Sequence, residues 1–490
     1  MNRAEMYRRF EAHAGPWDMI VVGGGATGAG VAVDSASRGY SALLLEQSDF
    51  GKGTSSRSTK LVHGGVRYLE QGNIPLVMEA LRERGILLRN APHLVHNLAF
   101  VVPSYDWWEA PFYGAGLKLY NLLAGTHGFG PSRILSREET LERLPNINTE
   151  GLRGGIIYFD GQFDDSRLLI SLVATASEQG AVLLNYAQVI TVDKDGVTFR
   201  DVETGHEFGA AAKVVVNATG PFTDDLRRMA DPSAKPIIAP SQGVHLVLDG
   251  SFLAGDSAIM VPHTSDGRVM FAIPWHGHTL VGTTDTPVAQ VSVEPVAQEQ
   301  EIEFLLHTAS LYLAKKPQRS DVTSVFAGIR PLVREGHSSS TAALSRSHTI
   351  RIEPSGMVTV CGGKWTTYRN MAEDCVNQAT RVGHLPEREC VTEHLAIHGS
   401  DAGALPLDQA VVLAVREEMA RTVEDVLARR TRALFLNAAA AIAMAPRVAA
   451  LMAHELGRDA EWEAAQVHAF EETARGFLPV RAHAPSGLVN

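Results

Sequence analysis

A glycine-rich turn near the N-terminus constrains the fold of this chain more than any other feature. The apolar run 18–22 ends at the sequence GGGATGAG, a helix-like stretch follows, and a second apolar run ends at Glu46. The spacing Gly23-x-Gly25-x-x-Gly28 between a strand and a helix allows a tight turn and a close approach of the backbone to a pyrophosphate. A carboxylate that ends the second strand can accept hydrogen bonds from a ribose diol. We therefore expect a dinucleotide-binding unit in which Gly23, Gly25, Gly28 and Glu46 contact the cofactor.

The segments that follow favour FAD over a nicotinamide cofactor. Residues 53–68 carry small hydroxyl side chains and a Gly-Gly pair, which suit a segment pressed against a flat ring system. Two later strand-like runs, 212–220 and 357–368, also end at small residues, and the second leads into a helix whose N-terminus would stabilise the anion of a reduced flavin. The expected contacts to the flavin half are Thr54, Ser55, Ser56, Thr59, Lys60, His63, Gly64, Ala218, Thr219, Gly220, Gly363, Lys364 and Thr366.

The order of these segments predicts an α/β (α+β) chain with an interrupted FAD-binding domain. We assign residues 17–80, 155–235 and 326–385 to that domain. The alternating pattern of 236–325 predicts an antiparallel sheet, which with 81–154 would form a cap domain that holds the substrate. Residues 390–490 have helical periodicity and predict a C-terminal α-helical domain. We expect Arg429, Arg430 and Arg432 on a solvated helix face, and contact with the main body is the alternative.

Composition narrows the partners and the compartment. The 490 residues carry 44 Lys and Arg against 55 Asp and Glu, and the net charge of −11 argues against a nucleic-acid partner. Three cysteines at spacings that match no metal signature fit a reducing cytosol, and we expect no metal site. The N-terminus lacks the apolar run of a secretory signal, and no uncharged apolar stretch has the length of a membrane span.

Several motifs together resemble the FAD-dependent glycerol-3-phosphate dehydrogenase family of quinone-linked flavoenzymes. They are GGGATGAG, SSRSTKLVHGGVRYLE, NATGP, IPWHGHTLVGTTDTP, GIRPLV and GGKWTTYR, spread over residues 17–385. The resemblance implies a glutathione-reductase-like FAD domain of the D-amino-acid-oxidase type that binds FAD non-covalently. It also implies a role in glycerol metabolism, with oxidation of sn-glycerol 3-phosphate to dihydroxyacetone phosphate by hydride transfer from C2 to flavin N5. Electrons would pass to a quinone from a peripheral protein on the cytoplasmic face of the cell membrane. The sequence does not determine the oligomeric state, for which a homodimer is one candidate.

The charged residues of these motifs suit a phosphorylated alcohol. Hydride transfer from a secondary alcohol needs a base for the hydroxyl proton, cationic donors for the oxygen and a clamp for the phosphate. Arg67, Arg330 and Lys364 each lie in a motif that the FAD assignment brings to the flavin, where they would reverse the negative charge of the chain locally. We assign Arg330 to the reacting oxygen as a catalytic residue, Arg67 and Lys364 to the substrate, and Tyr68, Thr284 and Asp285 to the surrounding polar shell.

His245 is the expected catalytic base. It follows Ser241 on a strand of the expected cap, resembles the histidine of the family there, and a neutral imidazole accepts protons near pH 7. His63 and His276 are alternatives, and a histidine with a structural role is another. The chain also departs from a family pattern Gly-Ser-x-His by having Gln242-Gly243, which leaves the backbone path before His245 open.

An aromatic segment bears on membrane binding. Six of the sixteen residues 105–120 are aromatic, against 7% of the whole chain. Paired Trp107 and Trp108 beside several leucines suit a wedge at the depth of lipid headgroups. An aromatic patch buried beneath the cap is the alternative.

Three other functions stay open on the sequence. The chain could be a glycerol-3-phosphate oxidase that uses O2 and produces H2O2, since the chemistry at the flavin would be similar. It could be an amine or amino-acid oxidase on the same scaffold, although such a site would need a hydrophobic cage in place of three cations. It could also be a non-enzymatic flavin-binding module.

Overall fold

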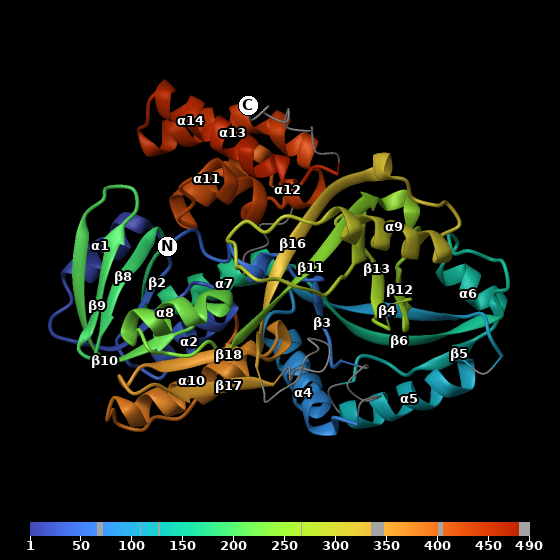
Figure 1. Cartoon of the computed structure of the whole chain (residues 1–490), viewed down its shortest axis with the longest axis horizontal. Helices are drawn as coiled ribbons and strands as arrows, with labels where there is room; N and C mark the ends of the chain where they lie inside the picture. The colour runs from blue at the N-terminus through green and yellow to red at the C-terminus, as the bar shows by residue number, and fades with distance from the viewer. Residues whose placement is uncertain are drawn as a thin grey trace, which may run out of the picture.

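The structure, a computed structural model, has two large sheets joined side by side and a group of helices across one end (Figure 1). It describes residues 1–65, 72–107, 109–125, 128–265, 267–334, 347–399 and 405–479. Arg67, Tyr68 and Trp108 therefore lie outside the described residues.

The first sheet binds together segments that are far apart in sequence. Its strands run in the order β17 (His348–Ile352), β18 (Val358–Gly362), β10 (Glu207–Asn217), β1 (Trp17–Val22), β2 (Ala42–Leu45) and β7 (Val182–Leu184). β18, β10, β1, β2 and β7 are parallel, so their carboxyl ends meet at one edge of the sheet. β8 (Ala187–Asp193) and β9 (Gly196–Asp201) form an antiparallel extension of β10.

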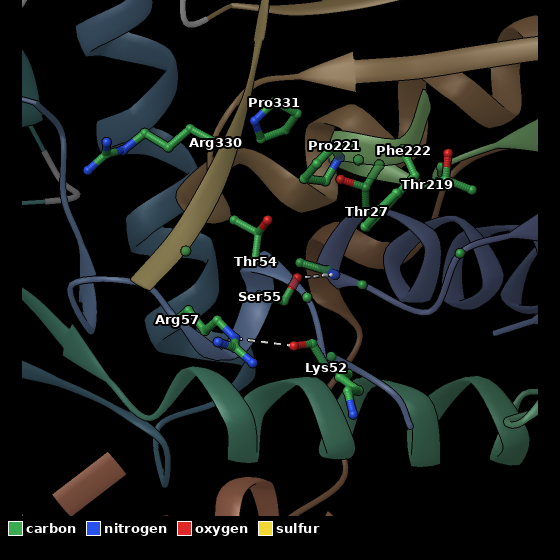
Figure 2. A pocket seen from close by; sticks show the side chains of 18 of the residues that line it. Thr27, Lys52, Thr54, Ser55, Arg57, Thr219, Pro221, Phe222, Arg330 and Pro331 are labelled. Carbon is green, nitrogen blue, oxygen red and sulfur yellow. Dashed lines mark hydrogen bonds between the residues drawn. The ribbon is translucent and has the colours of Figure 1, made fainter. Parts of the chain in front are cut away.

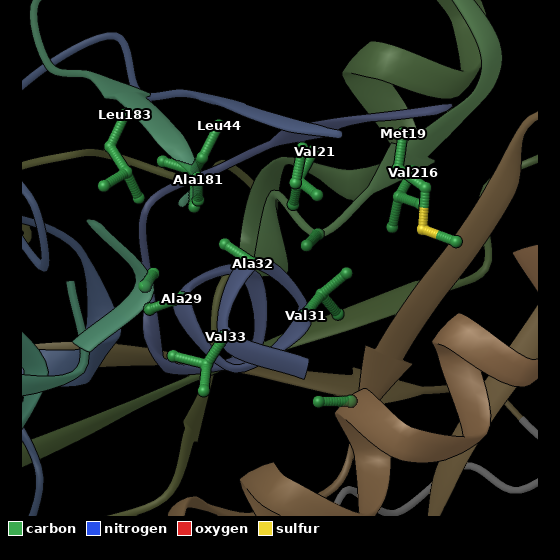
Figure 3. Packing of buried hydrophobic residues seen from close by; sticks show 14 of the residues in the cluster. Met19, Val21, Ala29, Val31, Ala32, Val33, Leu44, Ala181, Leu183 and Val216 are labelled. Carbon is green, nitrogen blue, oxygen red and sulfur yellow. The ribbon is translucent and has the colours of Figure 1, made fainter. Parts of the chain in front are cut away.

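Helices cover the first sheet, and this explains its apolar strands. α2 (Ala26–Ser37) packs against α7 (Asp165–Glu178) and α10 (Tyr368–Val382). Figure 3 shows the side chain of Ala32 on the side of α2 that faces Val21 and Leu44 of the sheet, whereas Val33 points away from them. Strands of a parallel sheet that is covered on both faces read as continuous apolar runs, as β1 and β2 do. The remaining helices near this sheet are α1 (Arg3–Glu11) and α8 (Thr223–Ala230).

The second sheet is mixed and mostly antiparallel. Its order is β15 (Thr286–Pro287), β11 (Ile238–Asp249), β14 (His278–Gly282), β13 (Met270–Trp275), β12 (Ser257–Val261), β4 (Val95–Ser104), β6 (Gly154–Phe163) and β3 (Leu61–Val62). β16 (Val322–Val333) pairs with β11, and β5 (Arg133–Leu135) pairs with β6. The helices of this part are α4 (Ile74–Asn90), α5 (Glu109–Ala124), α6 (Arg137–Arg143) and α9 (Glu299–Tyr312).

The sequence segments assigned to the two domains share this sheet. β6 and β16 come largely from segments expected in the FAD-binding domain, yet they pair with β4 and β11 of the expected cap, and β3 joins the same sheet through β6. The strand β16 runs without interruption across residue 326. The exact domain limits stay a prediction.

The C-terminal helices pack onto the second sheet. They are α11 (Leu407–Glu417), α12 (Ala433–Leu436), α13 (Ala438–Leu456) and α14 (Ala460–Arg475), and a π-helical turn spans Asp425–Arg430. Phe326 and Trp275 of the sheet share one buried cluster with Phe435 and Phe470 of the helices. The α-helical character of this region confirms the expectation from sequence.

The expectation of a solvated arginine face was wrong. Arg429 and Arg430 are buried, and both guanidinium groups donate to the carboxylate of Asp49. Arg432 pairs with Asp164 at 2.9 Å. Helical periodicity showed that these residues share a face, but it could not show that a carboxylate about 380 positions away covers that face.

One helix of the described part, α13, is long and apolar enough by length and composition to cross a membrane. The sequence analysis found no such stretch. α13 packs against α11, α12 and α14 within the C-terminal domain, and core helices often have the same composition.

Candidate functional site

A cavity of about 560 Å³ opens at the carboxyl edge of the first sheet. The ends of β1, β2, β10 and β18 line one side, and residues of β11 and β16 in the second sheet line the other. Figure 2 shows Thr27, Thr54, Ser55, Thr219, Phe222 and Arg330 around it. Loops at the carboxyl ends of parallel strands are where such folds bind cofactors.

The glycine turn is shaped to bring backbone N–H groups to a ligand. Gly23 and Gly25 line the cavity, and α2 begins directly after Gly25, which provides no side-chain cap. A side chain at Gly28 would collide with the carbonyl oxygen of Gly23, so Gly28 serves the turn from outside the cavity. The N-terminus and the dipole of α2 suit an anionic pyrophosphate.

Glu46 holds the turn from the neighbouring strand. Its carboxylate accepts hydrogen bonds from the N–H of Gly24 at 2.7 Å and of Ser48 at 2.8 Å. Burial raises the pKa of Glu46, and these two hydrogen bonds oppose that rise. Glu46 lines the cavity, and each carboxylate oxygen can accept a second hydrogen bond, as a ribose diol requires.

The segment 54–63 connects the two sheets along the cavity. Thr54 donates to the carbonyl oxygen of Ile329 at 2.5 Å, and Ser55 accepts from the N–H of Ala26 at 2.9 Å. The indole of Trp365 donates to the carbonyl oxygen of Ser55 at 2.8 Å. These contacts with α2, with β16 and with the residues just before α10 fix the backbone of this segment.

Most of the expected cofactor residues come together at this cavity. Those that line it are Gly23, Gly25, Glu46, Thr54, Ser55, Thr59, His63, Ala218, Thr219, Gly220, Gly363, Lys364 and Thr366. Those outside its lining are Gly28, Ser56, Lys60 and Gly64. The hydroxyl of Ser56 donates to the carbonyl oxygen of Gly51 at 2.8 Å, and the ammonium of Lys60 is paired with Asp165 at 2.7 Å.

Sequence reasoning missed several lining residues. Thr27 lies inside the glycine motif itself, and its position after Gly25 could have indicated its place. Gln188 and Val189 reach the cavity from β8, and their sequence carries no signal for it because only the pairing of β8 with β9 and of β9 with β10 brings them there. Lys52 and Arg57 also line it.

Arg330 is positioned by the pairing of β11 with β16, in which it lies opposite Ser241. Its guanidinium donates to Thr283 Oγ1 at 2.9 Å and to the carbonyl oxygen of Gln242 at 3.4 Å, and lies 3.5 Å from Asp285. A side chain at Gly243 would collide with this guanidinium. The departure at Gln242-Gly243 therefore leaves the strand regular, with glycine at the position that Arg330 crosses.

Thr284 and Asp285 are buried behind Arg330 and do not line the cavity. Asp285 accepts a hydrogen bond from the Ser241 hydroxyl and pairs with Arg330. Thr284 donates to Glu301 of α9 at 2.9 Å, and Glu301 also accepts from Gln242 at 2.8 Å. Glu301 is thus a further positioning residue, which the sequence analysis missed because its helical pattern alone shows no partner.

His245 lines the cavity and is buried, with 2% of its surface exposed. Its Nε2 lies 2.9 Å from Thr59 Oγ1, and its ring stacks on Phe326 with centroids 5.0 Å apart. Burial lowers the pKa of His245 well below 6.5, and the charges of Arg330 and Lys60 lower it further. The imidazole is therefore neutral near pH 7, as a proton acceptor must be.

The two alternative histidines differ in position. His63 lines the cavity, and its backbone N–H donates to the Thr366 hydroxyl at 3.2 Å. His276 does not line the cavity, and its Nε2 faces the carboxylate of Asp164 at 3.2 Å. The geometry favours His245 over His276 as the base.

The aromatic segment is partly exposed and partly buried. On α5 and just before it, Trp107, Phe112, Leu119 and Leu122 are exposed, whereas Leu117 and Tyr120 are buried. Ile74 and Met78 of α4 and Ile134 of β5 are also exposed. α4 and α5 lie along the lower edge of the molecule in Figure 1, opposite the C-terminal helices.

Comparison with known proteins agrees with this geometry. A family model described as FAD dependent oxidoreductase matches residues 18–369, and one described as the C-terminal domain of alpha-glycerophosphate oxidase matches residues 402–463. The solved structure of a glycerol-3-phosphate dehydrogenase from Bacillus halodurans complexed with FAD is similar with a TM-score of 0.77 at 29% identity. That similarity covers 97% of this chain and 98% of the other.

Two mitochondrial proteins show the relationship in sequence. The glycerol-3-phosphate dehydrogenase of Rattus norvegicus is 38% identical, with 94% of this chain and 73% of that protein covered. The glycerol-3-phosphate dehydrogenase of Arabidopsis thaliana is 47% identical over 404 residues, with 79% of this chain covered. The chain spans 64% of the length of the Arabidopsis protein.

Proposed function

Because the chain belongs to the FAD-dependent glycerol-3-phosphate dehydrogenase family, we propose that it oxidises sn-glycerol 3-phosphate to dihydroxyacetone phosphate. The residues at the cavity fit FAD. The glycine turn, in which a Cβ at Gly23 or Gly28 would collide with backbone atoms, stands beside Glu46, and small residues from three separate segments line the remaining length. When bound, FAD supplies the acceptor for the hydride that leaves C2 of the substrate.

The residues across the cavity from the glycine turn suit binding of the substrate and removal of its hydroxyl proton. His245 would take the proton of the C2 hydroxyl as the hydride leaves, and Arg330 would donate to the same oxygen as it becomes a carbonyl. Lys364 would offset the charge of the substrate phosphate, and Arg67 is proposed from sequence for the same task. Thr284 and Asp285 would hold Arg330 in place from behind, and Tyr68 is proposed for the polar shell.

One observation carries this proposal. His245 and Arg330 come from paired strands and line the same cavity as the glycine turn, so a proton acceptor and a cationic donor face a cofactor site together. An amine or amino-acid oxidase would need neither a phosphate clamp nor a second cation at Lys364.

Mixing the FAD-loaded protein with glycerol 3-phosphate under anaerobic conditions is expected to bleach the oxidised flavin band. The measurement is the visible spectrum before and after mixing, with glycerol and alanine as control substrates. A band that stays oxidised with FAD bound and substrate in excess would contradict the proposed activity, and would favour a flavin-binding module without turnover.

We propose a quinone as the electron acceptor, and an oxidase is the nearest alternative. The two differ in what reoxidises the flavin. The ratio of H2O2 formed in air to the rate with a soluble quinone separates them, and a peroxide yield near one per turnover would favour the oxidase.

We also propose peripheral binding to the cytoplasmic face of the cell membrane through the exposed apolar residues near α5. Amphipathic side chains in this arrangement bind at the interface of a bilayer. Replacing Trp107, Phe112 and Leu122 with serine should release the protein from vesicles and leave flavin reduction unchanged. Leu311→Ser, which alters an exposed leucine on α9, is the control and should remain bound.

Co-sedimentation with liposomes measures this effect. Retention of the triple variant would indicate that another surface binds the membrane. The homodimer stays a prediction, which analytical ultracentrifugation of the FAD-loaded protein tests.

A further inference from the structure

We propose that Thr59 orients the imidazole of His245 and fixes its tautomer, so that Nε2 carries the proton and Nδ1 accepts the proton of the substrate hydroxyl. This inference rests on the proposed function, in which His245 is the base. It makes Thr59 a positioning residue that acts through His245.

The hydrogen bond between the two side chains is the first observation. Thr59 Oγ1 lies 2.9 Å from Nε2, and both residues line the cavity. Nδ1 is buried and has no hydrogen-bond partner among the described residues. A neutral imidazole has one N–H and one lone pair, so a proton on Nε2 places the lone pair on Nδ1. A substrate hydroxyl would give this buried nitrogen the partner that buried polar atoms normally have.

The ring has little freedom to choose another orientation. Phe326 stacks on it with an angle of 18° between the two planes. On the adjacent strand β14, Gly282 faces the ring, and any side chain there would collide with it. Apolar packing therefore fixes the plane of the imidazole, and a proton on Nε2 would make the Thr59 hydroxyl oxygen its acceptor.

Thr59 is itself held by an unusual neighbour. Lys60 has a φ of 63°, in the left-handed region that non-glycine residues rarely adopt. Its ammonium donates to both carboxylate oxygens of Asp165, at 2.7 and 2.8 Å, and to the carbonyl oxygen of Ser56 at 2.7 Å. Such a backbone conformation persists only where its surroundings determine it.

Three aromatic rings complete the surroundings of Lys60. Its ammonium lies 4.9 Å from the centre of the Trp275 ring, 5.2 Å from that of Phe326 and 5.0 Å from that of Phe435. These rings come from β13, β16 and α12, so the cap and the C-terminal domain both anchor this side chain. Lys60 was expected at the cofactor, and its position in this cage points instead to support of Thr59 and His245.

The charges around the imidazole are arranged in pairs. Arg330 faces it from β16 and is paired with Asp285, whereas Lys60 faces it from the segment before β3 and is paired with Asp165. The adjoining strand β14 presents Gly282, which carries no charge. Burial and the two cations keep the ring neutral, so the tautomer decides which of its two nitrogens can act as the base.

The tautomer can be measured without turnover. In protein labelled with 15N-histidine, the His245 signals are those that disappear in His245→Gln. We expect a protonated Nε2 and an unprotonated Nδ1 in the wild type. A protonated Nδ1 would overturn the proposal whatever the substrate of the enzyme is.

Kinetics of Thr59→Val and Thr59→Ser give the second test. Valine has nearly the shape of threonine but cannot accept the Nε2 hydrogen bond, so we expect flavin reduction by glycerol 3-phosphate to slow by about 10- to 100-fold. We also expect the acid limb of its pH profile to move to lower pH, because the Thr59 oxygen stabilises the imidazolium more than the neutral ring. Serine keeps the hydroxyl and should restore both.

Thr308→Val is the matched control, because it removes a buried hydroxyl that, among the described residues, donates to the carbonyl oxygen of Phe304 within α9. It should behave as the wild type. A wild-type rate in Thr59→Val, an unmoved acid limb, or a shift of that limb to higher pH would each overturn the proposal. A wild type that glycerol 3-phosphate does not reduce would refute the proposed function and leave the tautomer result standing.

Discussion

His245→Gln is expected to slow the reduction of FAD by glycerol 3-phosphate by about 10²- to 10⁴-fold, the usual contribution of a general base. Glutamine approximates the size of the imidazole and can form hydrogen bonds, but it cannot take a proton at neutral pH. His245 is buried on β11 beside Arg330. His63, the other described histidine that lines the cavity, lies in a different segment and would not replace it. Stopped-flow absorbance at saturating substrate measures the rate directly.

The pH dependence of the wild-type rate of flavin reduction tests the same role of His245. Burial, Arg330 and Lys60 lower the pKa of His245, so the neutral ring is present at pH 7 and protonates only well below 6.5. The rate should therefore be flat around neutrality and fall on acidification, and His245→Gln should lose that limb. His276→Gln is the control, since His276 lies outside the cavity lining, and it should keep both the rate and the limb. If His63→Gln, and not His245→Gln, abolished the limb, the base would be His63.

Asp49→Asn is expected to destabilise the protein by about 3–5 kcal/mol, the usual loss when one member of a buried ion pair is removed. Asp49 is fully buried and accepts hydrogen bonds from Arg430 at 2.6 and 2.9 Å, as well as from Arg429. Asparagine keeps the shape but leaves two buried guanidinium groups with less negative charge. The midpoint of thermal unfolding should fall, and FAD should dissociate more readily because Asp49 follows Glu46 and Ser48 closely in the chain.

Lowering the pH should also reduce the stability of the wild-type protein. Burial alone would raise the pKa of Asp49, but Arg430 and Arg429 outweigh it and hold the pKa below 3.8. The stabilisation is therefore complete above the unfolded-state value and is lost as the pH falls through the folded-state pKa. Arg416→Met is the control, since its pair with Glu455 is largely exposed on the arginine side, and exposed ion pairs contribute little to stability. An Asp49→Asn variant as stable as Arg416→Met would show that the C-terminal domain is not held through this cluster.

The cofactor half of the site was predictable because its signals are local. The turn at Gly23, the strand before it and Glu46 at the end of the next strand lie within 30 consecutive residues, and each has a conformational reason for its residue type. Gly220 and Gly363 were found for the same reason, since each ends a strand of the same parallel sheet. The family and the FAD cofactor followed from these motifs and are confirmed by the comparisons.

The amino-acid sequence by itself determined the glycine turn, the helical C-terminal region and the position of His245 on a strand. Only the tertiary structure decided the partners of the charged and polar side chains. Lys60 turns from the cofactor to Asp165, Arg429 and Arg430 turn inward to Asp49, and Thr59 meets His245. The physical reason is that a strand or helix period specifies which face of an element a side chain occupies, whereas its partner depends on which distant segment covers that face.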